Sequence, residues 1–339
     1  MKILKIVLGL FLVLALVYVL GPKAKFEPVN AYIPKLPLKL DQIEEYLDGK
    51  QSLVTDLRNG NGYQLEYFNG LEKTEYVLLY LHGFSASPVE GAPLHLDFAK
   101  RYGMNFYAPL LADHGRNTKE SFYKVEPQDW VADAAEALAI AQLMGDKVIV
   151  MSCSTGSSLS TYLEANNENL IHAQIMYSPN FDIADSKSKL LTKPWGLQLF
   201  KLINGSEYRS FTLSEKAMPY WTTEYRAEGV IALRSLIDQT MTQKTWSAIK
   251  APYFIAYYFE NEEVHDDVIS VDAITSFDNS TNTPANEKLV LPMASPKSHV
   301  INSIYQSKGF EDVKQATYDY AEDILKLSPI EEFALEQND

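Results

Sequence analysis

Short apolar runs alternate with helical stretches through most of the chain. The runs expected to form strands are residues 63–68, 76–81, 104–107, 147–151, 173–177, 253–258 and 287–291. The clearest helix is expected over residues 127–144, where Trp130, Ala134, Leu138 and Ala141 recur on one face and Gly145 ends the pattern. This alternation predicts a mostly parallel sheet with helices covering both faces.

Residues 179–250 differ from the rest because they contain no convincing strand. This interval is far longer than the dozen or so residues that a crossover between parallel strands requires. Its aromatic side chains, amid helical spacing, are Trp195, Phe200, Phe211, Trp221 and Tyr225. We therefore expect a helical insertion here, placed between two strands of the sheet.

The first residues resemble a targeting segment. Residues 3–20 are apolar except for Lys5 and Gly9, and at about 1.5 Å per residue they nearly span a hydrocarbon core of about 30 Å. Lys2 and Lys5 supply the positive N-terminal region, and Pro22 follows without a small-residue cleavage signal. We expect a retained transmembrane signal anchor over residues 1–21, with the body outside the cytoplasm. The alternative is a cleaved signal and a secreted or periplasmic protein.

Prolines define the next segment. Pro22, Pro28, Pro34 and Pro37 favour extended backbone, so residues 22–59 are expected to be a linker and N-terminal arm. The body is expected over residues 60–328, followed by a C-terminal tail over residues 329–339.

Composition excludes several classes of protein. The chain has 30 Lys and Arg against 44 Asp and Glu, a formal net charge of -14, which disfavours a nucleic-acid partner. Its single cysteine, Cys153, excludes an intramolecular disulfide framework and a cysteine-based zinc cluster. A lone buried cysteine usually packs as a small hydrophobe.

A candidate nucleophile lies where the apolar run 147–151 ends. The sequence Ser152-Cys153-Ser154-Thr155-Gly156 has small residues two positions before and after Ser154. A sharp strand-to-helix turn requires such neighbours, and its usual pattern is G-x-S-x-G, with Ser152 here in place of the first glycine. Ser154 would then project from the carboxyl edge of the sheet. The alternative is a serine-rich loop that caps a helix.

Backbone amides near this serine could bind an oxyanion. The run 76–81 ends in His82-Gly83-Phe84, and a turn at Gly83 would aim the amide of Phe84 at the site. The second amide would come from Thr155, the residue after the nucleophile. His82 is expected to stiffen the loop by hydrogen bonding within it.

A base and an acid can be sought farther along the chain. Only His265 and His299 of the six histidines follow the run 253–258, and His299 also follows the last expected strand. Asp266 fits the pattern acid-x-apolar-apolar, with Val268 and Ile269 as its apolar residues, and its carboxylate would orient the imidazole of His299. Asp267 and Glu260 remain alternatives for this acid.

These motifs resemble the α/β-hydrolase fold family, in particular its monoglyceride-lipase, carboxylesterase and serine-aminopeptidase-like branch. The resemblance depends on H-G-F at 82–84, D-H-G at 113–115, S-C-S-T-G at 152–156, D-D-V-I at 266–269 and S-H-V at 298–300. It covers roughly residues 60–328 and implies a mostly parallel eight-stranded sheet with a helical cap. Asp113 stands where the branch has glycine.

The resemblance also implies a chemistry. Ser154 would attack an acyl carbonyl, with His299 as base, Asp266 as its partner and the amides of Phe84 and Thr155 as oxyanion hole. No metal or organic cofactor is required. The expected substrate is a carboxylic ester whose acyl chain lies among the aromatic residues of the cap. The alternatives are an amide or peptide hydrolase or an acyltransferase on the same fold, and a non-catalytic binding protein on a hydrolase scaffold.

Overall fold

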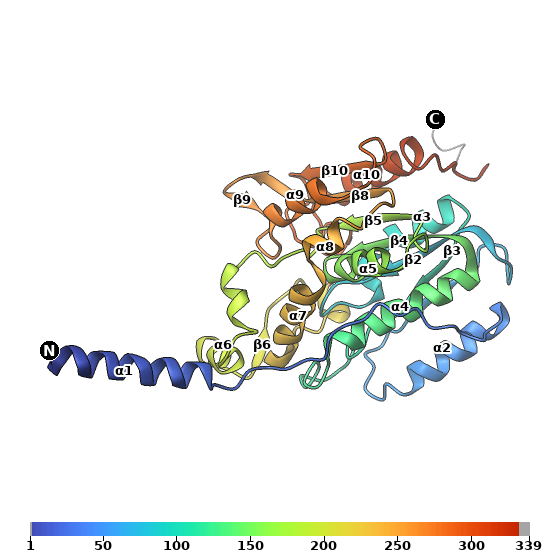
Figure 1. The fold of residues 1–339 in the computed structure, drawn as a ribbon. Helices are drawn as coiled ribbons and strands as arrows, with labels where there is room; N and C mark the ends of the chain where they lie inside the picture. The colour runs from blue at the N-terminus through green and yellow to red at the C-terminus, as the bar shows by residue number, and fades with distance from the viewer. Residues whose placement is uncertain (1, 332–339) are drawn as a thin grey trace.

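The computed structural model describes residues 2–331 (Figure 1). The strands are β1 (Gln64–Glu66), β2 (Thr74–Leu81), β3 (Asn105–Ala108), β4 (Gly145–Cys153), β5 (Ala173–Tyr177), β6 (Tyr208–Ser210), β7 (Glu224–Arg226), β8 (Tyr253–Asn261), β9 (Val264–His265) and β10 (Lys288–Met293). The α-helices are α1 (Lys2–Val19), α2 (Ile43–Ser52), α3 (Leu94–Arg101), α4 (Pro127–Met144), α5 (Thr155–Asn166), α6 (Gly196–Asn204), α7 (Ala227–Thr240), α8 (Gln243–Trp246), α9 (Val271–Ser280) and α10 (Phe310–Asp323). Short 3-10 turns are η1 (Leu40–Gln42), η2 (Pro88–Gly91), η3 (Ser186–Leu190) and η4 (Met218–Tyr220).

The main sheet has eight strands and is mostly parallel. Its order is β1-β3-β2-β4-β5-β8-β10, with β9 paired to β8. The neighbours from β3 to β10 pair in parallel, whereas β1 and β9 pair antiparallel. All seven apolar runs expected to form strands lie in this sheet, and the helix expected over residues 127–144 is α4. The predicted fold class is confirmed.

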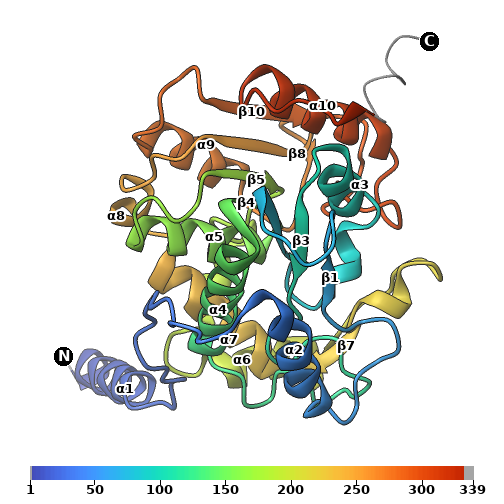
Figure 2. The same cartoon turned by 90° about the vertical axis from the view of Figure 1, so that its right-hand side faces the viewer.

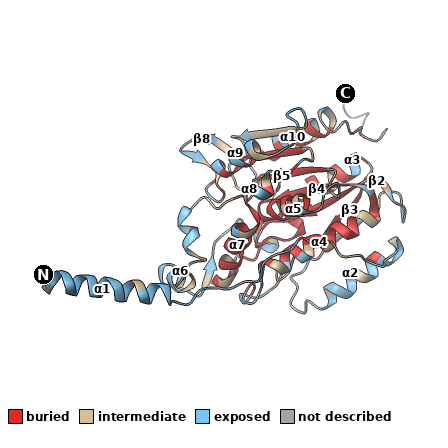
Figure 3. Cartoon of the chain, viewed as in Figure 1, coloured by how far each residue is buried: buried red, intermediate tan, exposed pale blue. Residues whose placement is uncertain are grey.

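The two faces of the sheet pack against different helices. In β2, Val77 and Leu79 join a buried cluster with α4, α5 and α9, whereas Leu78 and Tyr80 join a second cluster with α3 and α10. Alternate side chains of a strand point to opposite faces, so a strand buried on both sides is apolar at consecutive positions. Figures 2 and 3 show these helices around a buried sheet.

The parallel pairing places several chain reversals at one edge. The strands β2, β4, β8 and β10 all run in the same direction, so the loops that follow them meet beyond the same carboxyl edge. These four loops contain all of the candidate site residues. The topology therefore brings positions from 84 to 299 to one rim.

The insertion between β5 and β8 is mainly helical but not entirely so. It contains η3, α6, η4, α7 and α8, and also a small antiparallel sheet of β6 and β7. The expectation that residues 179–250 contain no strand is wrong at these two short segments. Each has only three residues, too few to produce a clear period-two pattern in the sequence.

Helix α1 projects from the body, and its apolar side chains are exposed along most of its length (Figures 1 and 3). Within residues 2–331, no helix is both long enough and apolar enough to cross a membrane. The predicted transmembrane anchor is therefore not supported.

The segment expected as a linker and arm packs on the body. Tyr162 in α5 donates a hydrogen bond to the carbonyl of Val29 at 3.0 Å, and the side chain of Gln239 accepts one from the Val29 amide at 3.0 Å. Ile43 and Leu47 in α2 are buried in the cluster with α4. These residues thus belong to the core of the body rather than to a free spacer. Most of the expected tail, residues 332–339, lies outside the described residues.

Candidate active site

Ser154 lies at a sharp turn between β4 and α5. Its backbone has φ 51° and ψ -114°, a conformation that residues other than glycine seldom adopt. The turn is held by a hydrogen bond from the Ser154 amide to the carbonyl of Tyr177 in β5, at 3.0 Å. This geometry matches the nucleophile turn that the small residues predicted.

Gly156 is required by the close approach of two chain segments. A Cβ atom at this position would lie 2.0 Å from the carbonyl oxygen of Leu81, at the end of β2. Ser152, which replaces the first glycine of the usual pattern, is fully buried, and its hydroxyl lies 3.0 Å from that of Ser157. Its small polar side chain is therefore accommodated by a partner in α5.

We expect Gly156→Ala to destabilise the fold. The clash is with backbone, which cannot rotate away, so the free energy of unfolding should fall by about 3 kcal/mol or more. The matched control is Gly49→Ala in α2, where no atom lies within 4 Å of an added Cβ. Thermal unfolding of both variants measures the difference. Equal melting temperatures would contradict this account of the turn.

His299 and Asp266 are hydrogen-bonded to each other. The Nδ1–H of His299 donates to Asp266 Oδ2 at 2.7 Å. The other carboxylate oxygen of Asp266 accepts from the amides of Val268 at 2.9 Å and Ile269 at 3.3 Å. Asp266 is 1% exposed. The apolar residues two and three positions after this acid thus supply backbone donors that fix its orientation.

The two alternative acids have other surroundings. Glu260 is exposed and accepts a hydrogen bond from Tyr258 at 2.7 Å, and it lies 3.3 Å from Lys297. Asp267 borders the same cavity as His299 but is exposed. Of the three acids, Asp266 is the one hydrogen-bonded to the imidazole.

The pair perturbs the pKa of both members. Burial alone would raise the pKa of Asp266, but the charge and hydrogen bond of His299 and the two backbone donors lower it overall. Burial alone would lower the pKa of His299, but the charge and hydrogen bond of Asp266 raise it above 6.5. The arrangement therefore stabilises an imidazolium beside a carboxylate.

The other candidate site residues line one cavity of about 510 Å³ together with His299. Its lining includes Phe84, Ser154, Thr155 and His299. Within the described residues, the amides of Phe84 and Thr155 have no hydrogen-bond acceptor. Two free N–H groups near a strained serine are the donors that an oxyanion requires.

The cap contributes apolar surface to this cavity. Phe211, Trp221 and Tyr225, which were expected among its acyl-binding residues, are part of the lining. Trp195 is placed differently. Its indole N–H donates to the carbonyl of Val17 in α1 at 3.1 Å, so it packs at the end of α1.

Two neighbours of the motifs have structural roles. The Nε2 of His82 accepts a hydrogen bond from the Leu111 amide at 3.2 Å, so in the neutral ring the proton is on Nδ1. The Nδ1–H then donates to the carbonyl of Gly83 at 2.9 Å. This agrees with the expectation that it stiffens the loop. Cys153 is fully buried in the cluster with α3 and α10, and burial raises the pKa of its thiol. It packs as a small apolar residue.

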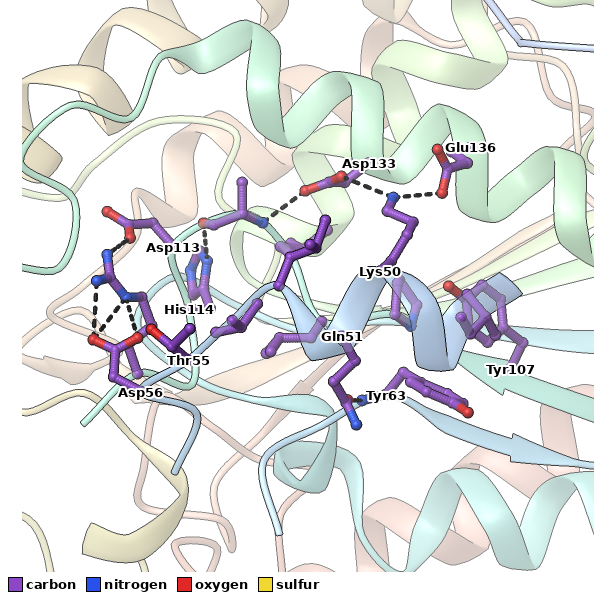
Figure 4. A pocket seen from close by; sticks show the side chains of 18 residues that line it. Lys50, Gln51, Thr55, Asp56, Tyr63, Tyr107, Asp113, His114, Asp133 and Glu136 are labelled. Atoms are coloured by element: carbon purple, nitrogen blue, oxygen red, sulfur yellow. Dashed lines mark hydrogen bonds and ion pairs between the residues drawn. The ribbon is translucent and has the colours of Figure 1, made fainter. Parts of the chain in front are cut away.

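A second cavity, of about 390 Å³, lies between α2, α4 and the loop after β3 (Figure 4). None of the five candidate site residues lines it. Lys50 is 2.5 Å from Glu136 and 3.8 Å from Asp133, and Arg116 is 2.9 Å from Asp56. Since these charges are paired with one another, we interpret the cluster as structural: Lys50 ties α2 to α4, and Arg116 ties the loop after β3 to the segment after α2.

Comparison with known proteins supports the fold. No protein-family model matches the chain, and no curated protein matches it. A solved structure from a study of LipS and LipT, two metagenome-derived lipolytic enzymes, is 16% identical with a TM-score of 0.64, covering 79% of this chain and 99% of its own. Est1E from Butyrivibrio proteoclasticus, solved with ferulic acid, is 12% identical with a TM-score of 0.51, covering 78% and 95%.

A monoacylglycerol lipase from Paleococcus ferrophilus is also similar, at 11% identity and a TM-score of 0.54, covering 73% of this chain and 95% of its own. Together with the sheet order and the turn at Ser154, these neighbours show that the chain has the α/β-hydrolase fold. At such low identity the likeness concerns the fold alone.

Sequence reasoning did not single out the buried acid that lines the cavity of Ser154 and His299. Glu90, in η2, is 1% exposed and borders the same cavity as Ser154 and His299. In the sequence it is an acid within P-V-E-G, seven positions after Gly83, and no motif distinguishes it from a solvated turn residue.

Proposed function

We propose that the protein is a serine hydrolase that cleaves carboxylic esters through an acyl-enzyme. One observation supports this above the others: a serine in a strained turn shares a cavity with a histidine that is 2.7 Å from a buried carboxylate. The free amides of Phe84 and Thr155 on the same cavity agree with it.

In the proposed mechanism, His299 removes the proton from Ser154 as its Oγ attacks the acyl carbonyl. Asp266 holds the imidazole with its Nδ1–H inward, which leaves Nε2 free to accept that proton. The amides of Phe84 and Thr155 donate to the tetrahedral oxyanion. The imidazolium then protonates the leaving alcohol, and water, deprotonated by the same histidine, releases the acid. These steps use side chains and backbone amides of the chain itself.

We expect activity to fall in mild acid. The base must be neutral, and the pKa of His299 is raised above 6.5, so kcat/KM should decline as the pH drops through a midpoint above 6.5. The measurement is a pH–rate profile of ester hydrolysis at constant ionic strength. A profile that stays flat down to pH 5 would contradict the assignment of His299 as base.

Ester chemistry is favoured over amide chemistry by the cavity. Phe211, Trp221 and Tyr225 give it an apolar wall suited to an acyl chain. The test is a panel of p-nitrophenyl esters of rising chain length beside aminoacyl amides. We expect esters to turn over faster, and faster amide cleavage would replace this proposal with a peptidase or amidase. An absence of turnover and of labelling by a fluorophosphonate would favour a binding protein.

For the location of the chain, we propose export across a membrane. Lys2 precedes the apolar segment 3–20 and Lys5 lies near its start, which gives the positive N-terminal region of an export signal. The test is protease accessibility of an epitope in the body, in intact and in permeabilised cells. Protection from protease in intact cells, with no processed form outside them, would contradict export.

A further inference from the structure

Glu90 is a second buried carboxyl group beside the candidate nucleophile. A Cβ atom built on Gly83 would lie 2.9 Å from Glu90 Oε1 and 3.3 Å from Ser154 Cβ. Gly83, in the oxyanion loop, therefore packs against both the carboxyl group and the serine. A buried carboxyl group is costly to ionise unless hydrogen-bond donors or positive charge compensate it. The presence of Glu90 at this buried position therefore requires an explanation.

Hydrogen bonds connect Glu90 to both loops of the site. Its Oε2 accepts from the Gly83 amide at 2.8 Å and from the Tyr80 hydroxyl at 2.9 Å. The Tyr80 hydroxyl in turn accepts from the side-chain amide of Asn302 at 3.0 Å, three residues after His299. Because the Gly83 N–H donates to Glu90, this part of the loop is fixed. The peptide that follows is then held in an orientation that leaves the Phe84 N–H without an acceptor within the described residues.

We propose that Glu90 is a positioning residue for the proposed serine hydrolase: it holds the oxyanion loop through Gly83, and its negative charge supports the imidazolium form of His299. The inference rests on the proposed function. It adds a second carboxylate to the one that contacts His299 directly, and this second group acts through the loop after β2.

The charged groups around Glu90 and His299 agree with this role of Glu90. The acids that raise the pKa of His299 are Asp266, by contact, then Glu90 and Asp267. Burial raises the pKa of Glu90 to about 7, and the Gly83 amide, the Tyr80 hydroxyl, the charge of His299 and the Cys153 thiol oppose that rise. Asp185 and Arg209 also line the cavity. The charge of each group thus changes the pKa of the other.

Glu90→Gln separates charge from hydrogen bonding. The glutamine oxygen can accept from Gly83 and Tyr80 as Oε2 does, whereas the charge is lost. The readout is the pH dependence of the rate of labelling by a fluorophosphonate, which requires no knowledge of the substrate. We expect the midpoint of the acid limb to move to lower pH, and labelling above pH 8 to slow by roughly a few-fold, because a less basic imidazole assists the attack of the serine less well.

Glu164→Gln is the matched control. Glu164 in α5 is also buried and also accepts backbone hydrogen bonds, from Lys250 at 3.0 Å and Ala251 at 2.9 Å. It lies nine residues after the start of α5, about 14 Å along the helix axis. This variant should keep the wild-type midpoint. An unshifted midpoint in Glu90→Gln, or an equal shift in both variants, would overturn the inference.

Glu90→Ala tests the hydrogen bonds. Without an acceptor for the Gly83 amide, we expect kcat for an ester to fall by on the order of 10²-fold with KM little changed, because an oxyanion donor acts mainly in the transition state. An unchanged kcat would contradict the positioning role. Wild-type protein that takes up no fluorophosphonate would instead refute the proposed function itself, so the two failures are distinguishable.

Discussion

Ser154→Ala should reduce kcat for ester hydrolysis by on the order of 10⁶-fold while leaving the protein folded. The variant removes the atom that forms the acyl-enzyme, and no other group can take its place in the turn. Alanine is tolerated about as well as serine at a backbone with φ 51°, so the melting temperature should change little. Initial rates with a p-nitrophenyl ester, beside thermal unfolding, test both statements.

Ser160→Ala is the control for this loss. Ser160 is in α5, the helix that follows the turn at Ser154, and it is fully buried, with its hydroxyl 2.6 Å from Gln174 Oε1. Removing that hydrogen bond should cost about 1 kcal/mol of stability and leave kcat within a few-fold of wild type. Equal losses in the two serine variants would indicate damage to the fold rather than removal of a nucleophile.

Asp266→Asn should reduce kcat by about 10⁴-fold. Asparagine can keep the hydrogen bonds from Val268 and Ile269, but it removes the charge that raises the pKa of His299 and favours the wrong tautomer of the ring. A pH–rate profile beside the kcat measurement would show both effects, since the acid limb should also move to lower pH.

Glu260→Gln is the comparison for that variant. Its carboxylate is exposed and lies 3.3 Å from Lys297, and surface pairs of this kind are worth roughly 0–1 kcal/mol. We expect its kcat to stay within about three-fold of wild type. A larger loss in Glu260→Gln than in Asp266→Asn would reassign the acid.

The sheet could be predicted from sequence because its signals are local and strong. A strand such as β2 is buried on both faces, so its apolar run is continuous, and α4 has Pro127 in its first turn and Gly145 after its end. The small residues around Ser154 were recognised as a local pattern, although the clash that requires Gly156, 2.0 Å between an added Cβ and the Leu81 carbonyl, comes from the neighbouring strand β2.

Other features depend on contacts between distant residues. The choice between Asp266 and Glu260 required the distance to His299, which no spacing along the loop provides. Glu90 becomes distinctive only when η2 packs it against Gly83 and Tyr80. The linker and arm were expected from prolines that favour extended backbone, and where this segment packs follows only from its contacts, as with Val29 against α5 and α7.

Peptide mapping after reaction with a fluorophosphonate tests the central claim most directly. We expect one phosphonyl adduct per molecule on the wild-type protein, located at Ser154, formed as the serine oxygen displaces fluoride from phosphorus. An adduct at another residue, or none under conditions that label a known serine esterase, would contradict the account.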